Sequence, residues 1–368
     1  MKPISYFPDF DALRAIAAIL VVLFHVNVWL DLPSNTFYEY LGIILSFNRQ
    51  GGEIGVHFFF VLSGFLITYL MFREQETTGE FSIRGFYWRR ICRIWPLYFA
   101  TVLIGFVIYP YLTVVLNRPY LETANFWYYL FFLANVNSYT NGFSLGILGV
   151  QWSVAIEEQF YLIWPLIFVL FNRKQFVYAV GLLLFIANLF IVNNLQHNNY
   201  IYFHSLSAVN ELAIGGLVAY FAFYKPIKLK IILSKVSQRI TGLVYTLGFI
   251  FLFFNKEMIE WLPFLAYIRK PLMALFFVFI LIEQSYSSNS VVKFRQFKGL
   301  SFLGKISYGV YLLHMVAIQI VLGVVSYIYV PIAIQILAVF VLTFLLSYLS
   351  YRFFESPFLK LKGSQRLN

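Results

Sequence analysis

The stretch DALRAIAAILVVLFHV, residues 11–26, decides the fold of this chain. It is apolar enough to cross a membrane as a helix, yet it carries Arg14 near its start and His25 deep inside. Eleven residues advance an α-helix by about 1100°, roughly 20° more than three full turns. Arg14 and His25 therefore share one helix face, about 16 Å apart along the axis. Both are costly against lipid, so we expect both to face a bundle interior or a wet cavity.

Two interpretations of this pair stay open from the helix alone. An arginine at the membrane mouth suits phosphate, and a buried neutral imidazole suits proton transfer. Alternatively, Arg14 extends to lipid headgroups while His25 only hydrogen-bonds a neighbouring helix.

The composition favours a membrane protein throughout the chain. Of 368 residues, 61% are hydrophobic, 21% aromatic and only 12% charged, whereas soluble domains are about a quarter charged. The apolar runs are continuous rather than alternating, which favours an all-α polytopic helical bundle over a barrel. The net charge of +11 is explained by basic cytoplasmic loops and does not require nucleic acid as a partner. A single cysteine, Cys92, excludes an internal disulfide, and no metal site is expected.

Ten apolar runs are long enough to cross a bilayer, which takes about 20 residues. They lie at about 10–30, 54–72, 94–115, 151–171, 175–194, 201–224, 239–256, 268–287, 301–325 and 331–353. The first run is interpreted as a retained helix rather than a cleaved signal, because acidic residues crowd its start and no small-residue cleavage site follows. Residues 125–139 form a doubtful eleventh segment, which is short and interrupted by Asn135 and Asn137.

The distribution of basic residues resolves the doubtful segment. If 125–139 does not span and both termini are cytoplasmic, most Lys and Arg residues fall on the inner side. The outer side then holds only Arg49, Arg118, Lys256, Arg269 and Lys270. We therefore expect ten spans in one membrane domain, residues 1–358, followed by a short basic cytoplasmic tail, residues 359–368.

The segment YWRRICRIWPLY, residues 87–98, places Arg90 and Arg93 on one face of a helix that enters the membrane from the cytoplasm. These guanidinium groups are candidates for binding a polyanionic ligand, and anchoring to anionic lipid is the alternative. Pro96 is expected in the first turn of the span that follows.

The segment GVHFFFVLSGFLITYL, residues 55–70, has the small pair Ser63 and Gly64 near its middle. Close helix packing is the favoured role of this pair, and room for a thin acyl chain is the alternative. His57 lies at the outer end of the span, where it needs no special explanation.

The segment QWSVAIEEQFYLIWPL, residues 151–166, places Glu157 and Tyr161 on one face at membrane depth. An ionisable residue at that depth is a functional candidate, whereas Glu158 points elsewhere and is the weaker one. Glu211, in another span, is interpreted as structural.

The segment GKISYGVYLLHMV, residues 304–316, spaces Tyr308, Tyr311 and His314 by threes, so that all three lie close to one helix face. They are further site candidates, with hydrogen bonding across helices as the alternative.

Taken together, these motifs place basic groups on the inner side and a histidine, an acid and tyrosines further out. Their order along the chain resembles acyltransferase family 3, the bacterial integral-membrane acyltransferases that modify surface and secreted glycans. The resemblance runs from FDALRAIAAILVVLFH to SYRFFESPF and includes FFVLSGF, the paired arginines with Pro96 and Tyr98, WS…EEQFY…WP, and SYGVYLLH. One departure is His57, where the family commonly has an acidic residue. A fused esterase-like domain, which some longer members carry, is not expected.

The resemblance implies a multi-pass enzyme of the bacterial inner (plasma) membrane. It implies transfer of an acyl group, usually acetyl, from cytoplasmic acyl-CoA (acetyl-CoA) to a hydroxyl of a polysaccharide or glycolipid on the far side. His25 becomes the base or acyl relay, and Glu157 and Tyr161 organise the reaction centre. Arg14, Arg90, Arg93 and Ser63 become donor-side residues. Membrane lipids are expected partners, and a second copy or a partner protein stays open.

Two other kinds of membrane protein would show some of the same features. A glycolipid or polysaccharide transporter (flippase) would also carry intramembrane charges, but it would more naturally show inverted repeats and broken helices. A family member that has lost catalysis is the other alternative, which the intact Arg14, His25 and Glu157 oppose. On geometry, Glu157 is expected to orient His25 if the bundle brings their helices together.

Overall fold

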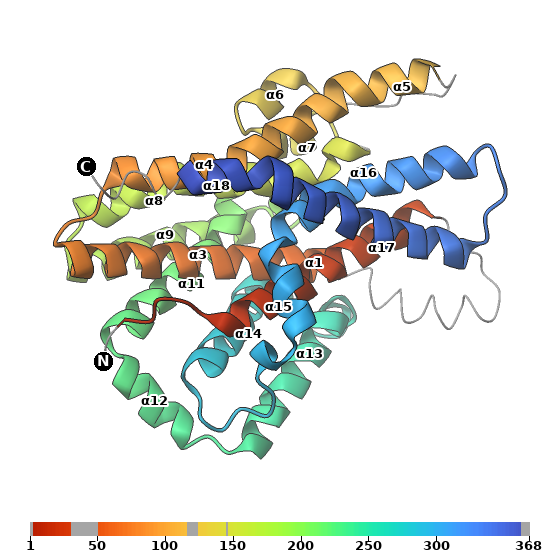
Figure 1. Ribbon diagram of the computed structural model, residues 1–368. Coiled ribbons are helices and arrows are strands. Elements are labelled where there is room, and N and C mark those ends of the chain that lie inside the picture. The colour runs from red at the N-terminus through yellow and green to blue at the C-terminus, as the bar shows by residue number, and fades with distance from the viewer. Residues whose placement is uncertain (1–2, 31–50, 116–123, 145, 362–368) are drawn as a thin grey trace. The chain divides into compact units, whose positions relative to one another are not determined.

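The structure is a computed structural model that describes residues 3–30, 51–115, 124–144 and 146–361 (Figure 1). Within these ranges all regular structure is helical, and ten helices are long and apolar enough to cross a membrane. The prediction of an all-α bundle with ten spans is confirmed. The spans are built from α1 (Pro8–Trp29), α3 (Gly51–Thr78), α4 (Ile83–Leu103) with α5 (Tyr109–Val115), α8 (Gln151–Leu170), α9 (Arg173–Asn193), α11 (Ser205–Tyr224), α13 (Gln238–Trp261), α14 (Leu265–Tyr286), α16 (Ser307–Val325), and α17 (Ile332–Leu349) with α18 (Ser356–Leu361).

The doubtful segment 125–139 does not span, as predicted. It forms two short helices, α6 (Phe126–Leu130) and α7 (Ala134–Thr140), which are separated by a turn (Figure 1). Phe132 in that turn has a φ of 54°, a left-handed conformation that favours glycine and ends helix α6. Each helix is far shorter than the roughly 20 residues that a bilayer requires.

The expected position of Pro96 in a first helical turn is wrong. Helix α4 begins at Ile83, where the Ser82 hydroxyl accepts a hydrogen bond from the Gly85 amide, so Pro96 lies well inside the helix. Helix α4 then passes through one π-helical turn, Ile104–Ile108, before α5 continues. A proline and a π turn are both known causes of helix bending, so this long span is a bent one.

The chain divides into two compact units, each made of three separate segments. Unit 1 contains Met1–Ala17, Glu53–Phe81 and Ile163–Lys305, and unit 2 contains Ala18–Gly52, Ser82–Leu162 and Ile306–Asn368. Helices α1, α3 and α8 contribute residues to both units. The single domain expected over residues 1–358 stays a prediction, and most of the expected tail, residues 362–368, lies outside the described residues.

In unit 1, α11 packs against α9 and α14, and two glycines allow α3 to approach α11 closely. A Cβ atom added at Gly64 would lie 1.9 Å from the Leu212 carbonyl oxygen, and one at Gly215 would lie 2.1 Å from the Val61 carbonyl oxygen. The favoured packing role of the small pair is thus confirmed at Gly64. A hydrogen bond also joins α8 to α3, because the Trp164 indole N–H donates to the Thr68 hydroxyl at 2.8 Å.

The start of α1 is fixed in unit 1 by a short polar chain. The Tyr6 hydroxyl donates to the Asp11 carboxylate, and Arg14 pairs with the same carboxylate at 3.1 Å. The hydrogen bond to Asp11 raises the pKa of Tyr6 to about 12. Arg14 therefore has an intramolecular acidic partner, rather than only the lipid headgroups of the alternative interpretation.

In unit 2, α16 and α17 run side by side as the most extensive helix pair (Figure 1).

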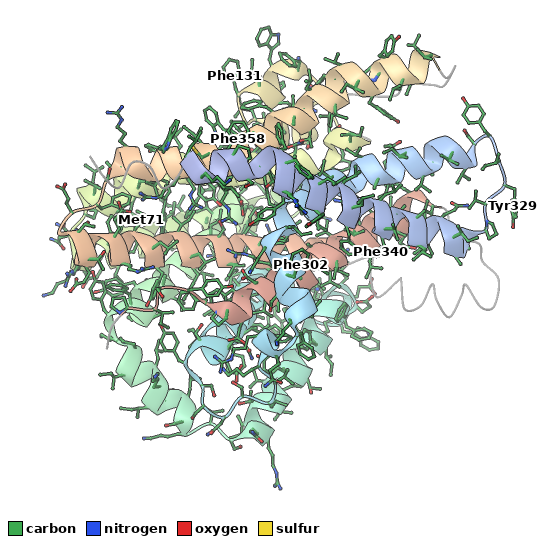
Figure 2. The ribbon with its side chains drawn as sticks, viewed as in Figure 1. Met71, Phe131, Phe302, Tyr329, Phe340 and Phe358 are labelled. Atoms are coloured by element: carbon green, nitrogen blue, oxygen red, sulfur yellow. The ribbon has the colours of Figure 1, made fainter. Side chains whose placement is uncertain are left out.

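Outward-facing positions of the spans remain strongly apolar, such as Val114 and Tyr178 with 76% and 77% of their surface exposed. Figure 2 contrasts the buried Met71 with Tyr329, which is 92% exposed in a connection between helices. Large apolar side chains without protein cover on membrane-length helices are the surface that lipid would solvate. The protein is a multi-pass membrane protein.

We predict that Gly64→Ala destabilises the protein by about 2–3 kcal/mol or more, because the new methyl group meets backbone that cannot move aside cheaply. Gly181→Ala in α9 is the matched control, since no atom lies within 4 Å of the added Cβ, and it should be neutral or stabilising by up to about 1 kcal/mol. Thermal unfolding in detergent compares the two. Equal midpoints would contradict the close contact of α3 with α11.

Candidate active site

A pair of buried histidines forms the centre of the polar groups in unit 2. His25 comes from α1 and His314 from α16, and the two ring centroids lie 4.9 Å apart. His314 Nε2 lies 3.2 Å from His25 Nδ1, which is hydrogen-bonding distance. The structure thus joins two residues that are 289 positions apart in the chain and that the sequence placed in separate motifs.

Backbone carbonyls fix the tautomer of both rings. His314 Nδ1 lies 3.1 Å from the Val310 carbonyl oxygen, which can only accept, so this nitrogen carries the proton and Nε2 presents a lone pair. His25 Nδ1 lies 2.9 Å from the Val21 carbonyl oxygen and faces that lone pair, so it also carries a proton. The remaining nitrogen, His25 Nε2, then holds a lone pair and makes no hydrogen bond within the described residues. It is suited to act as a base or a nucleophile.

Tyr311 extends the polar centre toward α8. Its hydroxyl lies 2.5 Å from Ser153 Oγ and donates to the Val150 carbonyl oxygen at 3.3 Å, while its ring meets the His314 ring edge-on at 6.1 Å. Ser153 was not singled out in the sequence, because a serine in an apolar helix gives no signal beyond its polarity. The contact ties the start of α8 to the helix that carries His314.

A second group in unit 2 is built on one face of α8. The Tyr161 hydroxyl donates to Glu157 Oε2 at 3.0 Å, which confirms that these residues share a face. The Arg90 guanidinium lies over the Tyr161 ring at 5.9 Å and the Phe86 ring at 5.7 Å. Its Nε is buried and has no hydrogen-bond partner among the described residues. A buried N–H that lacks a partner is a place where a ligand anion can be satisfied.

The neighbouring residues of α8 hold other segments in place. Glu158 accepts a hydrogen bond from the Trp95 indole at 2.8 Å, and Gln159 donates to the Phe132 carbonyl and to Asn135 Oδ1, both at 2.8 Å. The last two contacts fix the turn between α6 and α7 against α8. Glu158 therefore points elsewhere than Glu157, as expected, while the role of Gln159 was missed.

The structure does not show the contact expected between Glu157 and His25. Within the described residues, the hydrogen-bonding partners of His25 are the Val21 carbonyl and His314, so an imidazole takes the orienting role that was expected of a carboxylate. Tyr308 lies on the same helix as His314 and donates to the Ile94 carbonyl at 2.9 Å, a contact across helices.

The ten predicted site residues divide between the units. Unit 2 holds His25, Glu157, Tyr161, Arg90, Arg93, Tyr308, Tyr311 and His314, whereas Arg14 and Ser63 belong to unit 1. No group of three or more His, Cys, Asp or Glu side chains in the described part of the chain is arranged to hold a metal ion.

One sequence interpretation of unit 1 is wrong. His57 is not an incidental outer histidine, because it is buried and paired with Glu211 and Glu53. Arg269 and Lys270 lie near the start of α14, inside the apolar run expected at 268–287, and they pair with Glu53 and Glu211, which the sequence did not predict. The signal that could have shown this was Glu211 itself, an intramembrane acid that requires cationic partners.

Comparison with known proteins extends these observations. A family model described as an acyltransferase domain matches residues 7–352. The O-acetyltransferase OatA of Staphylococcus aureus strain NCTC 8325 / PS 47 is 30% identical over 378 residues, which cover 96% of this chain and 57% of that protein. The OatA protein of strain COL matches with the same identity and coverage. The chain thus spans less than two thirds of the length of these relatives. No solved structure matches.

We predict that Tyr311→Phe destabilises the protein by about 1 kcal/mol, because Ser153 Oγ loses its 2.5 Å partner and keeps only its hydrogen bond to the Val150 carbonyl. Tyr329→Phe, at a 92% exposed position, is the control and should change stability by less than about 0.5 kcal/mol. Both are measured as thermal unfolding in detergent. A Tyr311→Phe midpoint equal to that of the control would mean that the hydroxyl contacts contribute nothing.

Proposed function

The chain belongs to the acyltransferase family, and from this premise we propose that it is a membrane O-acetyltransferase that acts on a hydroxyl group of a surface glycan. The observation that carries the proposal is the histidine pair, which leaves His25 Nε2 as an available base in a buried setting. The name of the matched relatives, O-acetyltransferase, supports acetyl as the transferred group.

The proposed reaction moves an acyl group from a thioester sulfur to an alcohol oxygen. His25 Nε2 removes the hydroxyl proton as the oxygen attacks the thioester carbon, the new C–O bond forms and the C–S bond breaks. The imidazolium of His25 then returns this proton to the thiolate that leaves, so protons balance. His314 accepts from His25 Nδ1–H and steadies the positive charge that develops on the ring. His314 is therefore a positioning residue in this mechanism.

The proposed donor is acetyl-CoA, whose phosphates require basic partners. Arg90 offers a buried Nε without a partner, and Arg93 lies on the same face one turn later. Arg14, which precedes His25 by eleven residues in α1, is proposed as a further donor-side residue. Ser63, beside the close contact at Gly64, is proposed to line the acyl chain.

The glycan acceptor is proposed to approach from the outer side of a bacterial inner membrane. The concentration of Lys and Arg in the segments predicted to be cytoplasmic supports this orientation, with both termini inside. Glu157 and Tyr161, held together by their hydrogen bond, are proposed to organise the reaction centre. A polysaccharide or glycolipid is the proposed acceptor class, membrane lipids are proposed partners, and a second copy or a partner protein could complete the transfer.

We predict that His25→Ala abolishes acetylation of the acceptor while the protein still folds, because the base is removed. Glycans of cells that lack the gene are compared by mass spectrometry with those of cells complemented by wild type or by His25→Ala. An acetyl-sized mass that appears only with wild type supports the proposal. Full modification with His25→Ala would exclude His25 as the base, and identical glycans in all three strains would favour a small secreted acceptor or a transport function.

The same assay separates the role of His314 from a purely structural one. His314→Gln keeps a side-chain oxygen that can accept from His25 Nδ1–H and should retain most transfer. His314→Leu removes the acceptor, and transfer should fall about tenfold or more, with an altered pH profile. Equal rates in the two variants would contradict the tautomer assignment.

We predict that Arg90→Ala and Arg93→Ala each weaken acetyl-CoA binding about tenfold or more, since each removes a charged hydrogen-bond donor. The measurement is the ligand-induced rise in unfolding temperature in detergent, which depends on the dissociation constant. Arg173→Ala is the matched control, because Arg173 forms an exposed ion pair with Glu76. If acetyl-CoA raises the unfolding temperature of the Arg90 and Arg93 variants as much as that of wild type, these residues do not bind the ligand and lipid anchoring is their role.

A further inference from the structure

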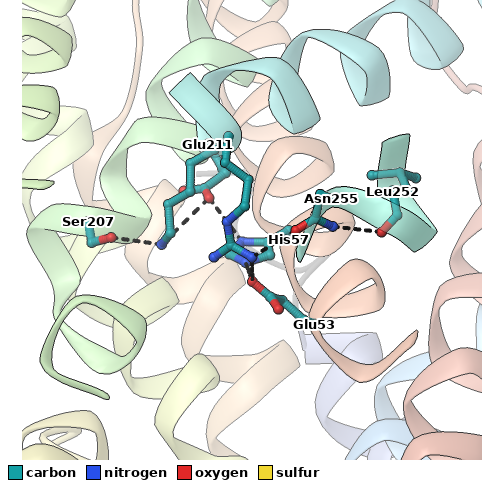
Figure 3. A network of polar contacts seen from close by, with 8 residues as sticks. Glu53, His57, Ser207, Glu211, Leu252 and Asn255 are labelled. Atoms are coloured by element: carbon teal, nitrogen blue, oxygen red, sulfur yellow. Dashed lines mark hydrogen bonds and ion pairs between the residues drawn. The ribbon is translucent and has the colours of Figure 1, made fainter. Parts of the chain in front are cut away.

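A buried network of charged side chains ties four helices of unit 1 together, and the proposed reaction does not use it (Figure 3). Its residues come from near one end of each helix: Glu53 and His57 of α3, Ser207 and Glu211 of α11, Asn255 of α13, and Arg269 and Lys270 of α14. Charged residues at such positions in membrane helices are costly and generally have a function.

Each carboxylate of the network already has a cation of its own. Glu53 Oε1 lies 2.7 Å from Arg269 Nη1, and Glu211 Oε1 lies 3.8 Å from Lys270 Nζ. The two cations have further acceptors, since Arg269 donates to Asn255 Oδ1 at 3.3 Å and Lys270 donates to Ser207 Oγ at 2.7 Å. These four charged groups therefore balance without any contribution from a histidine.

His57 lies between the two carboxylates. Its Nδ1 is 2.9 Å from Glu211 Oε1, and its Nε2 is 3.4 Å from Glu53 Oε1. A neutral imidazole has one N–H, so its other nitrogen would direct a lone pair at a carboxylate oxygen. The Nδ1 contact has an ion-pair distance but not the alignment of a hydrogen bond, so its attraction comes from charge. Carboxylate oxygens carry no proton to share, and both contacts are therefore attractive only when both ring nitrogens carry protons.

We propose that Glu53, His57 and Glu211 form a proton-binding site, in which the imidazole carries a proton on each nitrogen at neutral pH and exchanges one of them through Glu53. The site is separate from the acyl-transfer chemistry and does not depend on it. Glu211 is fully buried, whereas the Glu53 and Arg269 side chains are 12% and 19% exposed, so the exchange route opens at Glu53.

The charges around the ring keep the two protonation states close in free energy. With the extra proton the network has a net charge of +1, and a buried excess charge is unfavourable. Lys256 of α13 adds a further positive charge that acts on Glu53. Without the proton the network is neutral, but a ring lone pair opposes a carboxylate oxygen. Because each state has its own cost, one proton can bind and leave without unfolding the helices.

The test is ¹⁵N NMR of the full chain in lipid nanodiscs with labelled histidine, of which the chain has 5. The His57 signals are assigned as those that disappear in His57→Asn. If that variant does not fold, each of the other four histidines is replaced in turn, and the signals that no replacement removes belong to His57. At pH 7 we expect both His57 ring nitrogens to show the shift of a protonated nitrogen. A His57 ring with one unprotonated nitrogen at pH 7 would overturn the proposal.

A charge-removing variant tests whether the carboxylates hold the second proton. Glu211→Gln keeps the side-chain shape and removes the charge, and the His57 ring should then lose one of its two N–H protons at pH 7. Glu76→Gln, at an exposed ion pair in the same unit, is the matched control and should leave both protons in place. Should Glu211→Gln not fold, Glu53→Gln removes the other carboxylate and makes the same prediction. If the His57 ring keeps both N–H protons at pH 7 in the Glu211→Gln or Glu53→Gln variant, the proposal is also overturned.

Discussion

The constraint on which this structure depends is that a polar group inside an apolar helix must find its partner within the protein. Water is absent from the hydrocarbon region, so each buried donor or acceptor requires a side chain or a backbone carbonyl on its own or a neighbouring helix. Several contacts within each unit meet this requirement, and Arg90 Nε, which has no partner within the described part of the chain, is an exception. Trp164 meets Thr68, Tyr311 meets Ser153, and Tyr308 meets the Ile94 carbonyl. Such contacts set the register of helices whose apolar faces alone would pack in several ways.

The sequence predicted the features that depend on composition and local spacing. Hydrophobic runs located ten spans, because only helices of that length satisfy their backbone in lipid, although the third span begins at Ile83 and not near residue 94. The spacing of Glu157 and Tyr161 predicted that they share a helix face, and their hydrogen bond confirms it. Ordered motifs identified the acyltransferase family, which the match over residues 7–352 confirms. Each of these inferences needs only one helix or the order of helices.

The sequence did not predict the features that depend on which helices meet. Glu157 was a candidate to orient His25 if their helices met, and the partner that the structure shows is His314 on α16. Nothing in the local spacing distinguishes these outcomes, because both candidates lie on other helices. The partner of Lys270 was not predicted for a related reason. Its place at the start of an apolar run follows from the sequence, but its ion pair with the buried Glu211 depends on which helix lies beside α14. Such long-range partners are set by the fold and not by local hydropathy.

The two partnered histidines show how the same side chain is given different chemistry by its neighbours. His25 faces a carbonyl oxygen and the lone pair of another imidazole, which together hold one proton on Nδ1 and leave Nε2 unprotonated. His57 faces carboxylate oxygens on both sides, which favour a proton on each nitrogen. Burial alone would treat the two rings alike, since both lie among apolar helices and burial opposes any charge. The difference comes from the hydrogen-bonding character of the nearest atoms, so a buried histidine is best interpreted from its two ring contacts rather than from its depth.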